Sequence, residues 1–217
     1  MKQKKILLLL GGRWHDFSGF ARAMDDLLNT GEFIIEPTYD PAKLLRLSED
    51  GYDLVINYTC FAQPDPRASL VGSDRLNEEE VTACGKWVRE GGNLLSVHAS
   101  TVLGESYPGL KKLLGGAFLF HPEPFSFMVY PLVEQHPITD GIEAFAVYDE
   151  FFQQEIDPTV RLHMVAMDRG KAYPMVWSKP EGRGKVAHIA MGHEAQVWRN
   201  PSYQRLILQT INWLLSV

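Results

Sequence analysis

The chain has 217 residues, 45% of them hydrophobic, and is long enough to bury a substantial core without disulfide or metal staples. Its 21 basic and 27 acidic residues give a formal net charge of -6. Because an acidic surface repels nucleic-acid phosphates and anionic lipid headgroups, neither nucleic acid nor a membrane surface is an expected partner.

The first predicted element is a buried strand. Ile6 to Leu10 is a continuous apolar run ended by Gly11-Gly12, which is typical of a strand covered on both faces. Basic residues precede this run as in a signal peptide, but it is too short for a secretory or membrane-spanning segment. Cys60 and Cys84 have neither the number nor the spacing of a disulfide framework or a paired zinc motif, which favours a reducing cytoplasm.

Strands and helices alternate over about the first hundred residues, and this alternation predicts an α/β fold with a parallel sheet. Asn77 followed by three glutamates is a typical helix start, because an asparagine side chain caps free amides and carboxylates favour the positive end of the helix dipole. Cys84 shares a face of that helix with apolar residues and is expected in the core. The other predicted elements are a helix ending before Gly31 and strands at 33–37, 54–58 and 93–97.

The later part of the chain has a different amino-acid composition. Residues 116–168 contain long aromatic-rich stretches, which we interpret as added β structure covering one end of the sheet. Residues 185–190 form the last predicted strand, and Asn200-Pro201 places a capping side chain before a proline at the start of a final helix. No linker or repeat divides the chain, so residues 1–217 are expected to be a single domain.

Three histidines follow predicted strands. His15 follows the first strand, His98 the fourth and His193 the last. Ligands of open parallel sheets bind beyond the carboxyl ends of the strands, so these histidines predict a shared site. A lone histidine in such a place is more often structural. His163 and His188 lie inside predicted strands and are expected to be hydrogen-bonded structural or surface residues, whereas His136 is interpreted as a turn residue.

Asp149-Glu150 lies among aromatic residues, a setting that raises a carboxyl pKa when the group is buried without a partner. Such a carboxyl can serve as an acid or base. The alternative is that one of the pair caps a turn or faces solvent. Gly11-Gly12 lacks the spacing of a dinucleotide-binding loop, and no Walker sequence occurs, so nothing supports nucleotide binding.

The run from Gly91 to Ser100, GGNLLSVHAS, resembles a signature of the ThuA family, and further segments match in order over nearly the whole chain. The further matches are Gly11-Gly12 with His15-Asp16-Phe17, Gly115-Gly116 through His121-Pro122, His136-Pro137-Ile138 with Gly141-Ile142, Asp149-Glu150, Pro174 to Trp177, Gly182 to Val186, Gly192-His193 and Asn200-Pro201.

This resemblance implies a flavodoxin-like three-layer sandwich related to the class I glutamine amidotransferases. In those enzymes a cysteine nucleophile follows a central strand, and here His98 stands in its place. His193 matches their late histidine, although Glu194 is one position nearer to it than the amidotransferase glutamate. Because imidazole lacks the nucleophilic role of a thiolate in amide cleavage, glutaminase activity is not expected.

The resemblance also implies a carbohydrate ligand, namely trehalose or a keto-disaccharide. One hypothesis is a hydrolase, lyase or isomerase acting on an oxidised sugar, with His98 and His193 as acid and base and Glu150 assisting. Flat rings, imidazoles and carboxylates can bind a sugar. The alternative for Trp177 and the other aromatic residues is ordinary packing in the core. The residues expected to bind the substrate are Trp14, His15, Tyr58, His121 and Asp149.

A variant of this hypothesis is assisted by a divalent metal such as zinc, held by His15, His98, His121 and His193 with a carboxylate. The alternative is a non-catalytic sugar-binding or regulatory module that keeps the same crevice. A homo-oligomer is possible, because the segment 116–168 can act either as a lid or as a subunit contact.

Overall fold

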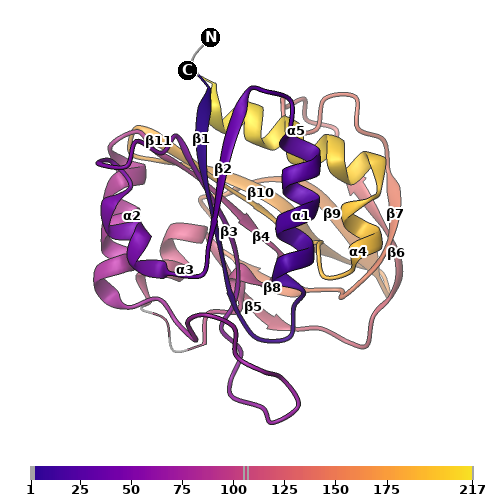
Figure 1. Cartoon of the computed structure of the whole chain (residues 1–217). Helices are drawn as coiled ribbons and strands as arrows, with labels where there is room; N and C mark the ends of the chain where they lie inside the picture. Colours follow the sequence, from indigo (N-terminus) through magenta and orange to yellow (C-terminus); the bar gives the residue numbers. More distant parts are fainter. Residues whose placement is uncertain (1–2, 105, 107, 217) are drawn as a thin grey trace.

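The structure is a computed structural model that describes residues 3–104, 106 and 108–216, and a nine-stranded sheet runs through its centre (Figure 1). Its strands are β1 (Lys4–Gly12), β2 (Phe33–Thr38), β3 (Leu54–Cys60), β4 (Asn93–Val97), β6 (Phe125–Pro131), β7 (Phe145–Asp149), β9 (Arg161–Asp168), β10 (Lys171–Glu181) and β11 (Gly184–Ile189). They are ordered β2-β1-β3-β4-β11-β10-β9-β6-β7.

The first five strands in this order are all parallel, in the arrangement of a flavodoxin-like sheet. The remaining four are joined by antiparallel pairs. Since each antiparallel pair reverses the direction, only β10 and β6 run against the other seven strands. The sheet is therefore mostly parallel in strand direction, which confirms the predicted fold class.

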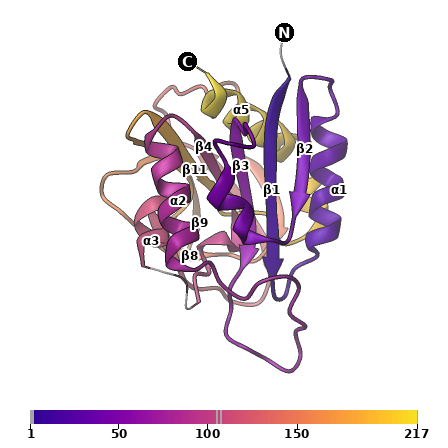
Figure 2. The ribbon, with the colours of Figure 1, turned by 60° about the vertical axis from the view of Figure 1, so that its left-hand side comes forward.

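Helices cover both faces of the parallel half, as Figure 2 shows for α1 and α2. Ile6, Leu8 and Leu10 of β1 belong to the core beneath α1 and α5, while Leu7 and Leu9 pack in the core beneath α2. No helix of the described residues is both long enough and apolar enough to cross a membrane. The helices are α1 (Phe17–Leu28), α2 (Glu78–Arg89), α3 (Gly109–Leu114), α4 (Ala195–Trp198) and α5 (Pro201–Leu215), with short 3-10 helices η1 (Pro41–Arg46) and η2 (His98–Thr101).

The predicted helix starts are confirmed in atomic detail. Asn77 accepts a hydrogen bond from the backbone of Glu80, whose side chain accepts one from the backbone of Asn77, so α2 begins with a capping box. Asn200 accepts hydrogen bonds from the backbone amides of Ser202 and Tyr203 at the start of α5. Cys84 lies in the core, as expected.

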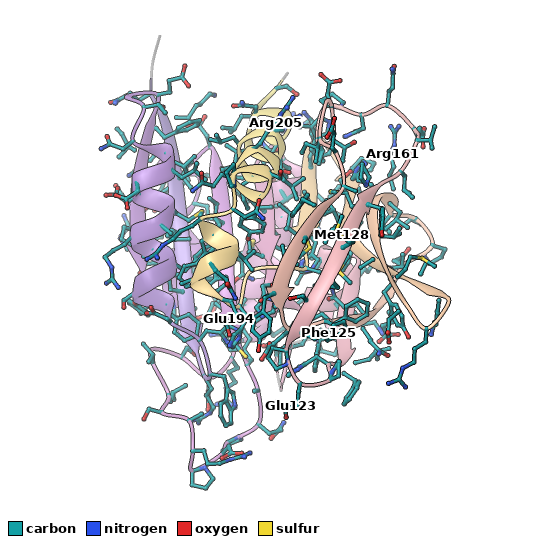
Figure 3. The ribbon with its side chains drawn as sticks, turned by 90° about the vertical axis from the view of Figure 1, so that its right-hand side faces the viewer. Glu123, Phe125, Met128, Arg161, Glu194 and Arg205 are labelled. Carbon is teal, nitrogen blue, oxygen red and sulfur yellow. The ribbon has the colours of Figure 1, made fainter. Side chains whose placement is uncertain are left out.

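The segment 116–168 differs from its predicted position. Strands β6, β7 and β9 do not cover an end of the sheet; they extend it sideways through β10, which is bonded to the edge of β11. Figure 3 shows β6, marked by Phe125 and Met128, on the side of the molecule away from α1. Only β5 (Gly116–Phe120) and β8 (Gln153–Ile156) form a separate two-stranded sheet. The physical reason is that β11 offers a row of unpaired backbone groups, which the β9–β10 hairpin satisfies.

Candidate functional site

Four side chains from four separate segments meet at the carboxyl ends of the strands, the lower edge of the sheet in Figure 2. His15 follows β1, His98 begins η2 after β4, Glu150 follows β7 and His193 follows β11. One nitrogen of each histidine and one carboxylate oxygen of Glu150 all lie within 4.8 Å of one another. We call these four residues the histidine cluster.

The backbone that carries the histidine cluster is unusually constrained. At Gly12, with φ of 112°, a Cβ atom would lie 1.9 Å from the carbonyl oxygen of Cys60, so only glycine permits this approach of the first loop to β3. His98 itself has a left-handed φ of 46°. Such a conformation costs on the order of 1–3 kcal/mol for a residue other than glycine and persists only where its surroundings enforce it.

Two rings of the histidine cluster are oriented by backbone carbonyl groups. His15 Nδ1 lies 2.9 Å from the carbonyl oxygen of Arg13, and His98 Nδ1 lies 2.7 Å from that of Ala190. Because a carbonyl oxygen can only accept, each Nδ1 carries a proton, and Nε2 of each ring faces the cluster, where its lone pair would bind a metal ion in the neutral form of the ring. This second-sphere arrangement is characteristic of metal-binding histidines.

His193 is oriented by the buried carboxylate of Asp149. This carboxylate accepts hydrogen bonds from the backbone amides of Gly192, His193 and Glu194, at 2.7, 3.0 and 3.2 Å. Burial raises the pKa of Asp149 to about 6, although His98 and the amides act to lower it. Asp149 is fully buried in this structure, and its contact with a substrate stays a prediction. It anchors the turn that carries His193.

The electrostatics of the cluster favour neutral rings at His15 and His193 beside an ionised carboxylate. Burial lowers the pKa of His15 well below its usual value, with further lowering by His98 and His193, and burial also lowers the pKa of His193. For His98, burial acts in the same direction but is outweighed by Glu150 and Asp149, so its pKa is raised. Burial would raise the pKa of Glu150, yet His98 and the other histidines hold it at about 2.

These distances fit a divalent metal ion. In a tetrahedral zinc site with bonds of about 2.0–2.1 Å, neighbouring ligand atoms lie about 3.3 Å apart. His15 Nε2 lies 3.1 Å from His193 Nδ1. Glu150 Oε2 lies 3.3 Å both from His98 Nε2 and from His193 Nδ1. Moreover, His98 Nε2 is buried and makes no hydrogen bond within the described part of the chain.

His121 was expected among the metal ligands, but Glu150 takes that place in the histidine cluster. His121 Nδ1 lies 2.8 Å from the carbonyl oxygen of Pro122, and its Nε2 lies 3.7 Å from the other carboxylate oxygen, Glu150 Oε1. It therefore stands beside the cluster rather than in it. No short spacing in the sequence relates Glu150 to the three histidines, so sequence reasoning assigned it only an acid–base role.

The two aromatic residues expected to bind substrate have different environments. Trp14 is 43% exposed, and the guanidinium of Arg67 lies 5.3 Å from the centre of its ring, so the ring is accessible to a ligand. Tyr58, in contrast, is completely buried and stacks on Phe20 with ring centres 3.8 Å apart. Its hydroxyl donates to the carbonyl oxygen of Gly192. That face of Tyr58 is part of the core in this structure, and its contact with a sugar stays a prediction.

Neither cysteine belongs to the histidine cluster. Burial raises the pKa of the Cys60 and Cys84 thiols to about 12, so neither forms a thiolate at neutral pH. Trp177 is fully buried and its indole nitrogen donates to the carbonyl oxygen of Leu114, which makes it a core residue.

Comparisons with known structures agree with this fold. A putative ThuA-like protein from Parabacteroides merdae ATCC 43184 is 17% identical, with a TM-score of 0.80 over 99% of this chain and 91% of that one. One from Bacteroides uniformis ATCC 8492 is 18% identical, with a TM-score of 0.76 over 99% and 93%. A cytoplasmic protein from Salmonella typhimurium LT2 is 13% identical, with a TM-score of 0.68 over 97% and 99%.

Among curated proteins, none matches the sequence significantly. A model of the ThuA family, whose description is trehalose utilisation, matches residues 5–214. That description associates the family with carbohydrate metabolism. Since the matched residues make up nearly the whole chain, the protein belongs to the ThuA family.

Proposed function

We propose that this protein is a metal-dependent enzyme of carbohydrate metabolism that acts on an oxidised sugar, such as a keto-disaccharide. The observation that carries this proposal is the convergence of three imidazole nitrogens and one carboxylate oxygen within 4.8 Å. The description of the family as trehalose utilisation supports the substrate class.

The residues of the histidine cluster suit a divalent ion such as zinc, since neutral imidazoles and a carboxylate are the forms that bind metals. Such an ion would polarise the carbonyl group of a keto sugar. The side chains of Glu150 and His193 are 13% and 22% exposed, so a small molecule reaches the cluster from their side. His121, beside Glu150, and the exposed ring of Trp14 are the residues that we assign to substrate binding.

The cluster does not support glutamine hydrolysis. The sharp turn after β4 carries His98, and both thiols are buried and protonated. A cytoplasmic location is part of the proposal, because two buried, unpaired cysteines suit a reducing compartment.

A specific contact favours a second candidate, which is acid–base catalysis without a metal. His98 Nε2 lies 3.3 Å from Glu150 Oε2. Burial acts to lower the pKa of His98, but Glu150 contributes most to raising it, and the net result is a raised pKa. In that case Glu150, whose side chain is 13% exposed, exchanges a proton with the sugar, and His98 behind it exchanges that proton with Glu150. A non-catalytic sugar-binding module is the third outcome that the experiment distinguishes.

The test is zinc titration of metal-stripped protein, followed by NMR of trehalose and its 3-keto derivative with and without zinc or manganese. We expect one zinc ion per chain and conversion of the keto sugar only with metal. His98→Ala should lose both zinc binding and conversion of the keto sugar. The control His136→Gln, outside the cluster, should keep both properties. Conversion without metal would favour the acid–base candidate. Ligand-broadened signals without conversion would favour the binding module, and absence of zinc binding would refute the metal centre.

A further inference from the structure

A chain of buried polar side chains lies directly behind His98, outside the histidine cluster. Every member is at most 8% exposed, although polar groups are costly to bury unless each finds a partner. The members come from four separate elements that surround the turn at His98. They are Ser96 of β4, Ser100 and Thr101 of η2, Gln154 of β8 and His188 of β11.

The hydrogen bonds among these polar side chains indicate which atom donates and which accepts. Thr101 Oγ1 donates to Gln154 Oε1 at 2.6 Å, so the amide nitrogen of Gln154 faces His188 Nε2, at 3.3 Å, and donates to it. His188 Nε2 is therefore the acceptor, and Nδ1 carries the proton and donates to Ser96 Oγ at 2.8 Å. Ser96 and Ser100 close the chain through a short contact between their hydroxyl groups.

This polar chain joins the two segments that carry His98 and Glu150. Thr101 Oγ1 also lies 3.2 Å from the carbonyl oxygen of His98, which is a second, more distant acceptor for its single hydroxyl proton. Gln154 follows Glu150 by four residues, and between them Phe152 packs on the His98 ring with centres 4.2 Å apart. The left-handed backbone of His98 must be held by its surroundings, and this hydrogen-bonded frame encloses it.

We propose that Thr101, Gln154 and His188 form a positioning network that sets the separation of His98 and Glu150 and thereby the metal affinity of the histidine cluster. The inference rests on the proposed metal centre. The three residues touch neither the ion nor the substrate; they act through His98 and Glu150. Removal of such second-sphere partners typically costs about 10- to 100-fold in metal affinity.

The first test compares Thr101→Val with Thr101→Ser in the full chain. Valine keeps the shape of threonine but removes the hydroxyl group, whereas serine keeps the hydroxyl group. Zinc affinity, measured by competition with a chromophoric chelator, should fall about 10- to 100-fold in Thr101→Val and stay near wild type in Thr101→Ser. Equal zinc affinity of wild type and a folded Thr101→Val protein would overturn the proposal.

A second pair of variants separates positioning from stability. Gln154→Leu leaves His188 Nε2 buried without a donor, so both melting temperature and zinc affinity should fall. The double variant Gln154→Leu/His188→Phe removes both polar partners and keeps a ring against Trp177, so its melting temperature should recover. A positioning role predicts that zinc affinity stays low in the double variant. Recovery of affinity together with melting temperature would show that the network is only structural.

Failure of the metal centre can be told apart from failure of this inference. If wild-type protein binds no zinc, the proposed function is refuted, and the network is judged by imidazole nitrogen NMR. His98 should then show its proton on Nδ1 in wild type and Thr101→Ser, and a changed signal in Thr101→Val. An unchanged His98 signal in Thr101→Val would overturn the positioning role even without a metal.

Discussion

The sharpest test of the site geometry is Gly12→Ala. At this position an added Cβ atom would lie 1.9 Å from the carbonyl oxygen of Cys60 and 2.9 Å from its amide nitrogen, and these are backbone atoms that cannot rotate away. Gly91 provides a matched control, because its φ of 115° is close to the 112° of Gly12 and, apart from its chain neighbours, no atom of the described residues lies within 4 Å of its added Cβ. Both substitutions place a side chain in a backbone conformation that L residues rarely adopt.

The expected magnitudes follow from this difference. The backbone conformation alone should cost each variant about 1–3 kcal/mol in the free energy of unfolding. Forcing an extra methyl group into a packed region adds about 1–3 kcal/mol at Gly12 only. The first loop must also move away from β3 and carry His15 with it, so Gly12→Ala should weaken zinc binding as well, whereas Gly91→Ala should not.

Urea unfolding of the two variants and wild type measures the first effect, and zinc titration measures the second. If Gly12→Ala and Gly91→Ala are equally stable and bind zinc equally well, the close approach of the first loop to β3 does not position His15. The geometric argument for the histidine cluster would then be refuted.

Three further predictions concern metal, pH and substrate. Zinc at 100 times its Kd should stabilise wild type by about 2.7 kcal/mol, a melting temperature rise of roughly 5–10 °C, and Glu150→Gln should show less than half this rise; an equal rise would exclude Glu150 as a ligand. Burial, with His136 and Arg161, lowers the pKa of His163 to about 3. Below pH 6.5 only the unfolded state therefore protonates this imidazole, and the free energy of unfolding decreases as the pH is lowered. In His163→Gln the dependence of unfolding free energy on pH between 6 and 4.5 should be shallower by roughly 1.4 kcal/mol per pH unit, and an unchanged slope would contradict the assignment. Trp14→Ala should keep the zinc affinity of wild type but weaken binding of the keto sugar in NMR titrations, and unchanged sugar binding would remove Trp14 from the site.

Local sequence patterns were sufficient for most of the secondary structure. The apolar run at Ile6–Leu10 and the caps at Asn77 and Asn200 depend on neighbouring residues, and the structure confirms all three. The short helix α3 was not predicted, because its six residues span too few turns to show a periodic pattern.

Sequence reasoning also placed His15, His98 and His193 at one edge of the sheet, because the carboxyl ends of parallel strands converge whatever the loops between them do. It named His121 and an unspecified carboxylate beside these histidines, whereas Glu150 is the fourth member of the cluster. Which residue joins the cluster depends on where β5 and β7 lie relative to η2, which no local pattern contains.

What the sequence by itself determined was the α/β class, the parallel half of the sheet and the edge at which the histidines gather, since these follow from periodicity, capping and strand direction. Only the tertiary structure decided that the segment 116–168 extends the sheet, that Tyr58 and Asp149 are buried, and that Glu150 completes the histidine cluster. Those outcomes depend on contacts between residues far apart in the chain, where differences of a few ångström separate a ligand from a neighbour.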